Sequence, residues 1–229
     1  MDLGALGSFD RLREGQVEWV FLTEDSSKKY IKKLAKSSGY NMANSVFYSY
    51  RTSSQLNSAL YLAEFIKDIA PDTKIIIHRD RDFLTNEEVE WVSKKIKYSG
   101  AFPFITEESD IEGYYITPNH LSELIDKDEE EIEAWISDIA TKYHNQLMHK
   151  FTRKRDEAKI LYRRRDEEPP ETMVLLGEDT PLRPEKRLGK FMFKKIRGGI
   201  KGQFGVNVDI TQETLHLTSQ RLTELLENA

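Results

Sequence analysis

The sequence predicts an α/β protein whose parallel sheet is flanked by helices. Two observations lead to this fold class. Over the first 105 residues, short apolar runs alternate with amphipathic helical patterns, and the connections between them are short. In addition, the run Lys74–Asp82 places three isoleucines in a row before a charged end, which is typical of a strand buried on both faces.

Four strands and three helices are expected in this part of the chain. The strands are expected at Val17–Thr23, Ser45–Tyr50, Lys74–Asp82 and Ala101–Ile105. The helices are expected from a cap at Ser26 or Ser27 to Gly39, from Gln55 to Ile69, and from about Thr85 to Tyr98. Thr85 and Glu88 have the spacing of a capping box at the start of the last of these helices.

The rest of the chain is expected to be mainly helical. The expected elements are a short helix at Pro118–Ile125, one long helix or two at Lys127–Arg164, a proline-rich loop at Asp166–Pro184, a helix at Glu185–Ile196 and an amphipathic helix at Thr211–Leu226. Four glycines are expected to break the chain between the last two helices, at positions 198, 199, 202 and 205. The expected division is a linker-like start (1–16), an α/β core (17–126), a helical insertion with its loop (127–184), and a C-terminal part that completes the core domain (185–229).

Composition excludes several kinds of chemistry. The chain has no cysteine, so disulfides, thiolate zinc sites and cysteine nucleophiles are excluded. No apolar run approaches the length of a membrane span and the start has no signal-peptide pattern, so a cytoplasmic protein without membrane contact is expected. Residues 150–201 hold 16 Lys and Arg against 9 Asp and Glu, although the whole chain has a net charge of −5. A basic segment beside an acidic remainder suits a metal-binding core with a polyanion contact.

Three carboxylates are expected near the carboxyl ends of neighbouring strands. Asp80 and Asp82 end the third strand, and on an extended chain they would point the same way about 6 to 7 Å apart. Two such carboxylates repel each other unless a cation lies between them or one of them takes a proton. Glu24 ends the first strand, so in a parallel sheet it can converge on the same edge. Hard cations such as Mg²⁺ prefer ligands of this kind.

These residues form part of a wider resemblance. Phe-Leu-Thr-Glu at 21–24, Ile-Ile-Ile-His-Arg-Asp-Arg-Asp at 75–82, Asp-Ile-Glu-Gly-Tyr-Tyr at 110–115 and Leu-Gly-Lys at 188–190 resemble the motifs of the Toprim domain. More specifically, the motifs resemble the Toprim nuclease domain of OLD-type endonucleases and related anti-phage effectors. It covers about residues 17–200, and it implies a Toprim-like sheet with a helical insertion and C-terminal helices.

The resemblance also implies an activity and its residues. A nuclease that depends on Mg²⁺ or Mn²⁺, with one or two ions, is expected. Its metal ligands would be Glu24, Asp80 and Asp82, and Lys190 would be a catalytic cation near the scissile phosphate. Family members often carry an aspartate four residues after the glutamate, where this chain has Lys28. Asp25 or Glu112 would then take the place of this aspartate, or a second ion would bind weakly.

The partners expected from the sequence are a nucleic acid and an ATPase. The basic residues that could contact a phosphate backbone are Arg153, Lys154, Arg155, Arg163, Arg164, Arg165 and Lys194. The chain contains no P-loop motif. If its relatives are a guide, an ABC-type ATPase, in the same chain or as a separate subunit, would regulate the nuclease in an anti-phage defence system. A homodimer is also possible.

Two alternatives from other functional classes remain open. Glu24-Asp25 and Asp80 also match the acidic pocket of a receiver-like signalling domain, but that class expects a Lys-Pro after a fifth strand and about half this length. A Toprim domain that only binds a partner is the second alternative, and the intact Glu24 and Asp80/Asp82 pattern argues against it.

Overall fold

The computed structural model describes residues 10–162 and 168–228. Arg163, Arg164 and Arg165, three of the expected phosphate contacts, lie outside the described residues. The chain forms two compact units, which are described one at a time below. Among the described residues, the first unit contains residues 10–79, 89–105 and 218–228, and the second contains residues 80–88, 106–162 and 168–217.

The first unit is built on a four-stranded sheet in which every strand pair is parallel. In the order β2-β1-β3-β4, the strands are β1 (Trp19–Thr23), β2 (Ser45–Ser49), β3 (Lys74–Arg79) and β4 (Phe102–Ile105). The three isoleucines of β3 are completely buried, as a central strand covered on both faces requires. Pro103 lies on the edge strand β4, where a residue without an N–H is tolerated. The predicted α/β class with a parallel sheet is therefore confirmed.

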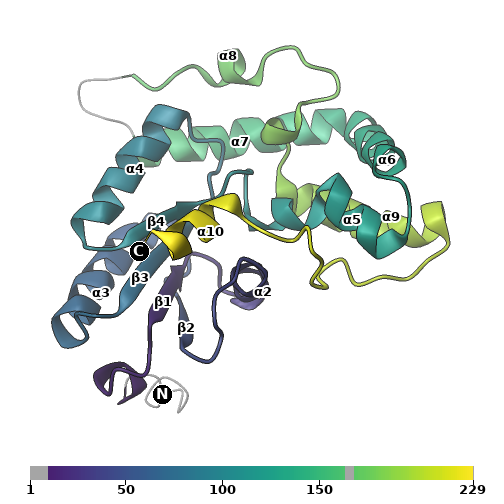
Figure 1. Ribbon diagram of the computed structural model, residues 1–229. Coiled ribbons are helices and arrows are strands. Elements are labelled where there is room, and N and C mark those ends of the chain that lie inside the picture. The colour runs from purple at the N-terminus through teal and green to yellow at the C-terminus, as the bar shows by residue number, and fades with distance from the viewer. Residues whose placement is uncertain (1–9, 163–167, 229) are drawn as a thin grey trace. The chain divides into compact units, whose positions relative to one another are not determined.

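Helices cover both faces of this sheet. They are α2 (Lys29–Ser37), the 3₁₀ turn η1 (Ser53–Gln55), α3 (Leu56–Ile69), α4 (Asn86–Tyr98, of which residues 89–98 belong to this unit) and α10 (Gln220–Glu227). In Figure 1, α3 and α4 lie on one side of the strands and α2 on the other, as right-handed crossovers require. The hydroxyl of Tyr40, which follows α2, donates to the carbonyl of Leu222, and this bond joins α10 to the α2 side.

The second unit is helical. Its elements are η2 (Ile111–Ile116), α5 (Pro118–Ile125), α6 (Glu129–Lys142), α7 (His144–Tyr162), α8 (Thr172–Leu176), η3 (Pro184–Lys186) and α9 (Gly189–Phe204). The expected Lys127–Arg164 segment is thus two helices within the described residues. Buried Ile132, Leu147 and Ile196 contribute to the core that these helices enclose, and Trp135 packs edge-on against Phe204.

The prediction that glycines break the chain after Ile196 is wrong. Helix α9 continues through Gly198, Gly199 and Gly202 and ends at Gly205, which adopts the left-handed conformation with φ +72°. A glycine inside a helix costs about 1 kcal/mol. Burial of Ile196 and Ile200 offsets this cost, and Gly199 is the residue that fits under Trp135, because a Cβ there would lie 3.0 Å from its ring.

Two other boundaries also differ from expectation. The proline-rich segment expected to be a loop contains the short helix α8. The expected helix at Thr211–Leu226 is reduced to α10, which begins after Ser219, whose side chain accepts a hydrogen bond from the Leu222 N–H. Before it, the chain is irregular because the buried His120 holds it through Thr214 Oγ1 at 2.7 Å and the Ile210 carbonyl at 2.9 Å.

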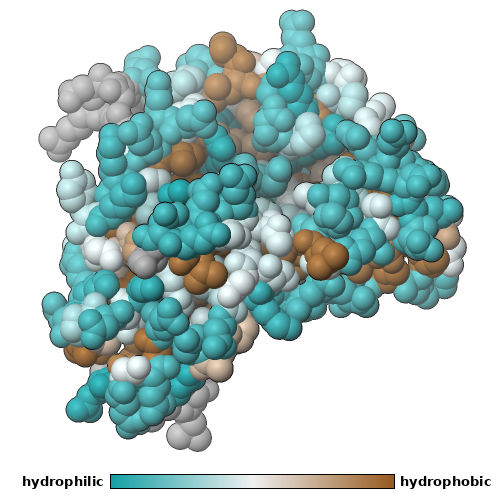
Figure 2. All heavy atoms as spheres, in the orientation of Figure 1, coloured by the Kyte–Doolittle hydropathy of each residue, from teal (hydrophilic) through white to brown (hydrophobic). Residues whose placement is uncertain are grey.

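The visible surface is predominantly polar. On the face drawn in Figure 2, hydrophilic residues dominate and hydrophobic ones form separate small groups. This agrees with a composition in which 32% of residues are charged. Among the described residues, no helix combines the length and apolar character that a membrane crossing needs.

Candidate metal and nucleic-acid site

The two aspartates of the D-x-D motif lie on a turn and not on an extended strand. Strand β3 ends at Arg79, and both Asp82 (φ 47°) and Phe83 (φ 62°) adopt the left-handed conformation. The expected alternation of side chains along a strand through Asp82 is therefore wrong. Left-handed residues other than glycine are costly, and they are concentrated at functional sites.

The second unit holds this turn through hydrogen bonds from its own residues. The Asp80 carboxylate accepts a bond from the Ile111 N–H at 3.1 Å. The Asp82 N–H donates to the Ser109 carbonyl at 2.9 Å, and the side chain of Asp82 pairs with Lys154 at 3.0 Å. Both aspartates are consequently fixed by the segment that carries the 110–115 motif and by α7.

Asp80 and Asp82 line one cavity together with a third aspartate. The cavity has a volume of about 420 Å³, and it is lined by Asp80, Asp82, Asp110, Lys150, Arg153, Lys154, Leu188, Lys190, Phe191, Lys194 and Lys195. Sequence reasoning gave no role to Asp110. The signal was present, because Asp110 follows the fourth strand as Asp80 follows the third, and carboxyl ends of parallel strands collect functional residues.

Asp110 occupies an unusual electrostatic environment. Its side chain is buried, and this burial raises the pKa of its carboxyl group, with a further contribution from the Asp82 charge. The Lys190 N–H and charge and the Ser109 hydroxyl act in the opposite direction. Oδ1 of Asp110 has no hydrogen-bond partner among the described residues. A buried acceptor of this kind beside two other carboxylates is suited to a cation.

Lys190 lies at the same cavity, as the sequence motif predicts. It is the second residue of α9, and its N–H donates to Asp110 Oδ2 at 3.0 Å. Its ammonium is 3.7 Å from Glu112, a buried carboxylate, while about half of the Lys190 side chain is exposed. Gly189 makes this approach possible, because a Cβ there would lie 2.3 Å from Asp110 Oδ1. Glu112 was expected as a possible ligand for a second ion. In the structure its carboxylate pairs with the Lys190 ammonium.

The expected nucleic-acid contact at Arg155 is wrong, because its side chain is completely buried. The guanidinium forms two hydrogen bonds with the Glu88 carboxylate, at 2.5 and 2.8 Å. The same carboxylate accepts from the Thr85 N–H at 2.8 Å, which confirms the capping box. The burial of Arg155 could have been predicted from helical spacing. Leu147, Phe151 and Arg155 are four residues apart and lie on the same buried face of α7.

The other basic residues form one wall of the cavity. Arg153, Lys154 and Lys194, all expected phosphate contacts, line it together with Lys150 and Lys195. Lys195 lies over the ring of Tyr143 at 4.0 Å, and Lys150 lies over Phe191 at 5.1 Å. These ring contacts hold cationic groups beside a cluster of carboxylates, a combination that suits a phosphate and a metal ion together.

Glu24 and Asp25 belong to the first unit. Thr23, the last residue of β1, lies opposite His78 of β3 in the parallel register, and Glu24 follows it in a buried position. Glu24 therefore leaves the sheet at the edge where β3 ends. The convergence of Glu24 and Asp25 on the three aspartates stays a prediction.

Comparisons with known proteins give no assignment. No family model, curated protein or solved structure matches this chain. The resemblance to Toprim nucleases therefore rests on the four sequence motifs, and the functional argument rests on the geometry of the second unit.

Proposed function

We propose that this protein is a divalent-metal-dependent nuclease of the Toprim type, which hydrolyses phosphodiester bonds of DNA or RNA. The observation that carries the proposal is the cavity of the second unit. Three aspartates, Lys190, four further lysines and one arginine line it. Carboxylates beside cationic groups serve both a hard metal ion and a phosphate.

The oxygen ligands that these residues offer are of the type that Mg²⁺ or Mn²⁺ prefers. All three acidic side chains offer oxygen ligands, and Asp110 contributes a buried oxygen that lacks a hydrogen-bond partner among the described residues. Asp80, Asp82 and Asp110 would hold the ion, with Glu24 as the ligand expected from the motif. When bound, a divalent ion polarises a phosphate oxygen and lowers the pKa of a water molecule.

The residues of the chain itself perform the remaining tasks. Lys190 stabilises the negative charge that develops on the phosphate during hydrolysis, and Glu112 keeps its ammonium beside Asp110. Lys154 pairs with Asp82 at 3.0 Å, and it would be released to contact a phosphate if a bound cation neutralised that carboxylate. Arg153 and Lys194, which line the same cavity, contact the nucleic-acid backbone.

The proposal includes a biological setting that rests on the resemblance alone. The nuclease would be an effector of an anti-phage defence system, regulated by an ABC-type ATPase. Copurification of such an ATPase with the protein from its native host would support this setting independently of the nuclease chemistry.

The experiment that tests the proposed chemistry is cleavage of plasmid DNA and of structured RNA with Mg²⁺ or Mn²⁺, by the parental protein and by Lys190→Ala. We expect the variant to lose about 10²- to 10³-fold in turnover, because one cationic group that stabilises developing charge is removed. Its Mn²⁺ affinity, measured by calorimetry, should be close to the parental value. Lys194→Ala should lose much less turnover.

Lys201→Ala is the matched control, because Lys201 is an exposed lysine on the same helix that does not line the cavity. It should cleave at the parental rate. Parental activity in Lys190→Ala would show that the match to the Gly-Lys motif is accidental. No cleavage of any substrate by the parental protein with either ion would overturn the proposed function.

The basic residues of the cavity lead to a separate prediction about how DNA binding depends on salt concentration. In Arg153→Ala/Lys194→Ala, binding of duplex DNA in Ca²⁺ should weaken uniformly across sequences. The slope of log affinity against log salt should flatten by about 2, since each lost phosphate contact removes about 0.9. Fluorescence anisotropy over a salt series measures this slope. An unchanged slope would assign these side chains to solvent, and Lys201→Ala should leave the slope unchanged.

A further inference from the structure

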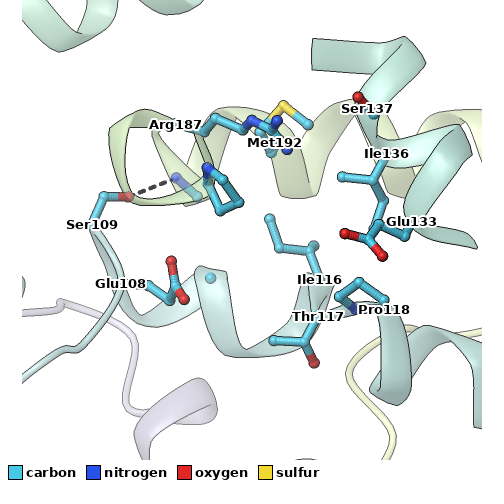
Figure 3. Close-up of a pocket in the computed structure, with 13 residues that line it drawn as sticks. Glu108, Ser109, Ile116, Thr117, Pro118, Glu133, Ile136, Ser137, Arg187 and Met192 are labelled. Atoms are coloured by element: carbon cyan, nitrogen blue, oxygen red, sulfur yellow. Dashed lines mark hydrogen bonds between the residues drawn. The ribbon is translucent and has the colours of Figure 1, made fainter. Parts of the chain in front are cut away.

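A second cavity lies in the same unit, on the other side of the segment that carries Lys190. Its volume is about 220 Å³. Arg187 and Gly189 line this cavity, whereas Leu188 and Lys190 line the one that holds the aspartates. The bond from the Gly189 N–H to the Ser109 hydroxyl, drawn as a dashed line in Figure 3, forms part of the wall. Ser109 and Gly189 support the neighbouring catalytic residues from this wall, and the other lining residues have no role in the proposed cleavage.

The walls of this cavity are largely apolar. Ile116, Ile136 and Met192 come from η2, α6 and α9, and Figure 3 shows them around a common space together with Pro118. A cavity of about 150 Å³ with apolar walls is large enough for benzene. The present volume therefore suits one ring or two fused rings.

A few polar groups are placed around this apolar space. Glu108 and Glu133 approach from opposite sides, and Arg187 lies along the top of the view in Figure 3. Glu108 is partly buried beside this space, whereas Glu133 is more exposed. Burial lowers the pKa of Arg187, against the charges of Glu185, Glu108 and Glu133.

Two of these groups restrict the ligand. The Glu133 carboxylate accepts hydrogen bonds, and the Arg187 guanidinium donates them. A ligand must therefore offer donors to Glu133 and acceptors to Arg187. Guanine does so, with N1–H and N2–H₂ on one edge and O6 and N7 on the other, and O6/N7 is the usual partner of arginine.

We propose that this cavity binds a nucleobase, with guanine as the best match. The inference rests on the proposed function only for the source of the base. In a nuclease, the base can belong to the substrate strand held in the neighbouring cavity, or to a free nucleoside that regulates cleavage. In both cases the ligand contacts the face of Gly189, next to the residue that carries the catalytic ammonium.

The test measures binding of guanosine, adenosine, cytidine and thymidine to the metal-free protein. Ligand-observed NMR titration is the method. We expect guanosine to bind most tightly. Glu133→Gln should weaken guanosine binding about tenfold or more, because it removes a charge-assisted hydrogen bond. Ser137→Phe should abolish binding, since its ring fills the cavity from α6, and the Ser137 side chain makes no hydrogen bond among the described residues that would be lost.

Glu130→Gln, an exposed change on the same helix, is the control and should bind as the parental protein does. Circular dichroism confirms that each variant is folded. Absence of guanosine binding, tighter adenosine binding, or full binding by folded Ser137→Phe would overturn the proposal. None of these outcomes depends on cleavage, so failure of the proposed nuclease activity is seen separately.

Mapping of cleavage positions on a mixed-sequence oligonucleotide then distinguishes the two sources of the base. If the cavity reads the substrate, cuts will cluster at a fixed distance from guanine in the parental protein, and Ser137→Phe will lose this preference. If it takes a free nucleoside, added guanosine will change the cleavage rate without moving the cut positions.

Discussion

Asp80→Asn/Asp82→Asn is expected to abolish binding of Mn²⁺ and to reduce cleavage by at least about 10³-fold. The reason is that two of three carboxylates at one cavity lose their charge, and a divalent ion contributes several kcal/mol to such chemistry. The fold should survive, because asparagine retains the oxygen that accepts from the Ile111 N–H, and the Asp82 N–H is unaffected.

Thermal unfolding with and without Mn²⁺ separates metal binding from stability. In the parental protein the ion should raise the midpoint, since a ligand of the folded state stabilises it. In the double variant the ion should have no effect, while the metal-free midpoint should change little, because relief of the repulsion between like charges offsets loss of the Asp82–Lys154 ion pair. Glu129→Gln/Glu130→Gln, which removes two exposed charges, should retain the metal response. An equal metal response in the Asp80/Asp82 variant would overturn the site.

Arg155→Met is expected to destabilise the protein by about 3 to 5 kcal/mol. Arg155 is completely buried and its partner Glu88 nearly so, and removal of one partner leaves an uncompensated charge. Because the Arg155 guanidinium also reaches toward the Phe83 carbonyl, and Phe151 packs against the Phe83 ring at 4.5 Å, the turn that carries Asp82 should loosen. Mn²⁺ affinity should therefore fall as well. Urea unfolding and calorimetry measure the two effects.

The pH dependence of this loss follows from Glu88. Burial raises its pKa, but the hydrogen bonds from Arg155 and Thr85 and the Arg155 charge outweigh burial and bring the pKa below its usual value of 4.5. A carboxyl group with a lowered pKa contributes stability above its unfolded-state value and loses it as the pH falls through the folded-state value. The difference between the parental protein and Arg155→Met should thus be full at neutral pH and shrink below about pH 4.5.

Arg155→Met/Glu88→Gln is the matched test of this pair. Glutamine retains an oxygen for the Thr85 N–H and removes the buried charge, so most of the lost stability should return. A double variant as unstable as Arg155→Met would show that the lost packing of the arginine, and not the unpaired carboxylate, is responsible.

The site was predictable only in part. The D-x-D aspartates and Lys190 were read from their motifs, and all line the same cavity. The 110–115 motif did not show a role for Asp110, because its contact with Lys190 joins residues 80 positions apart in the chain, and Glu112 of the same motif pairs with Lys190 as well. A run of basic residues does not show by charge alone which member is buried. Arg155 differs from Arg153 and Lys154 only in lying on the apolar face of α7.

The parallel sheet was predictable from local sequence, because strands buried on both faces are continuous apolar runs, and Ile75, Ile76 and Ile77 form such a run. It also determined the start of α4, since the capping box is a local arrangement of Thr85 and Glu88. Tertiary structure decided the rest. Packing against Trp135 carried α9 through its glycines, and bonds to distant residues turned Asp82 out of the strand, because contacts between segments far apart in the chain outweigh local propensities.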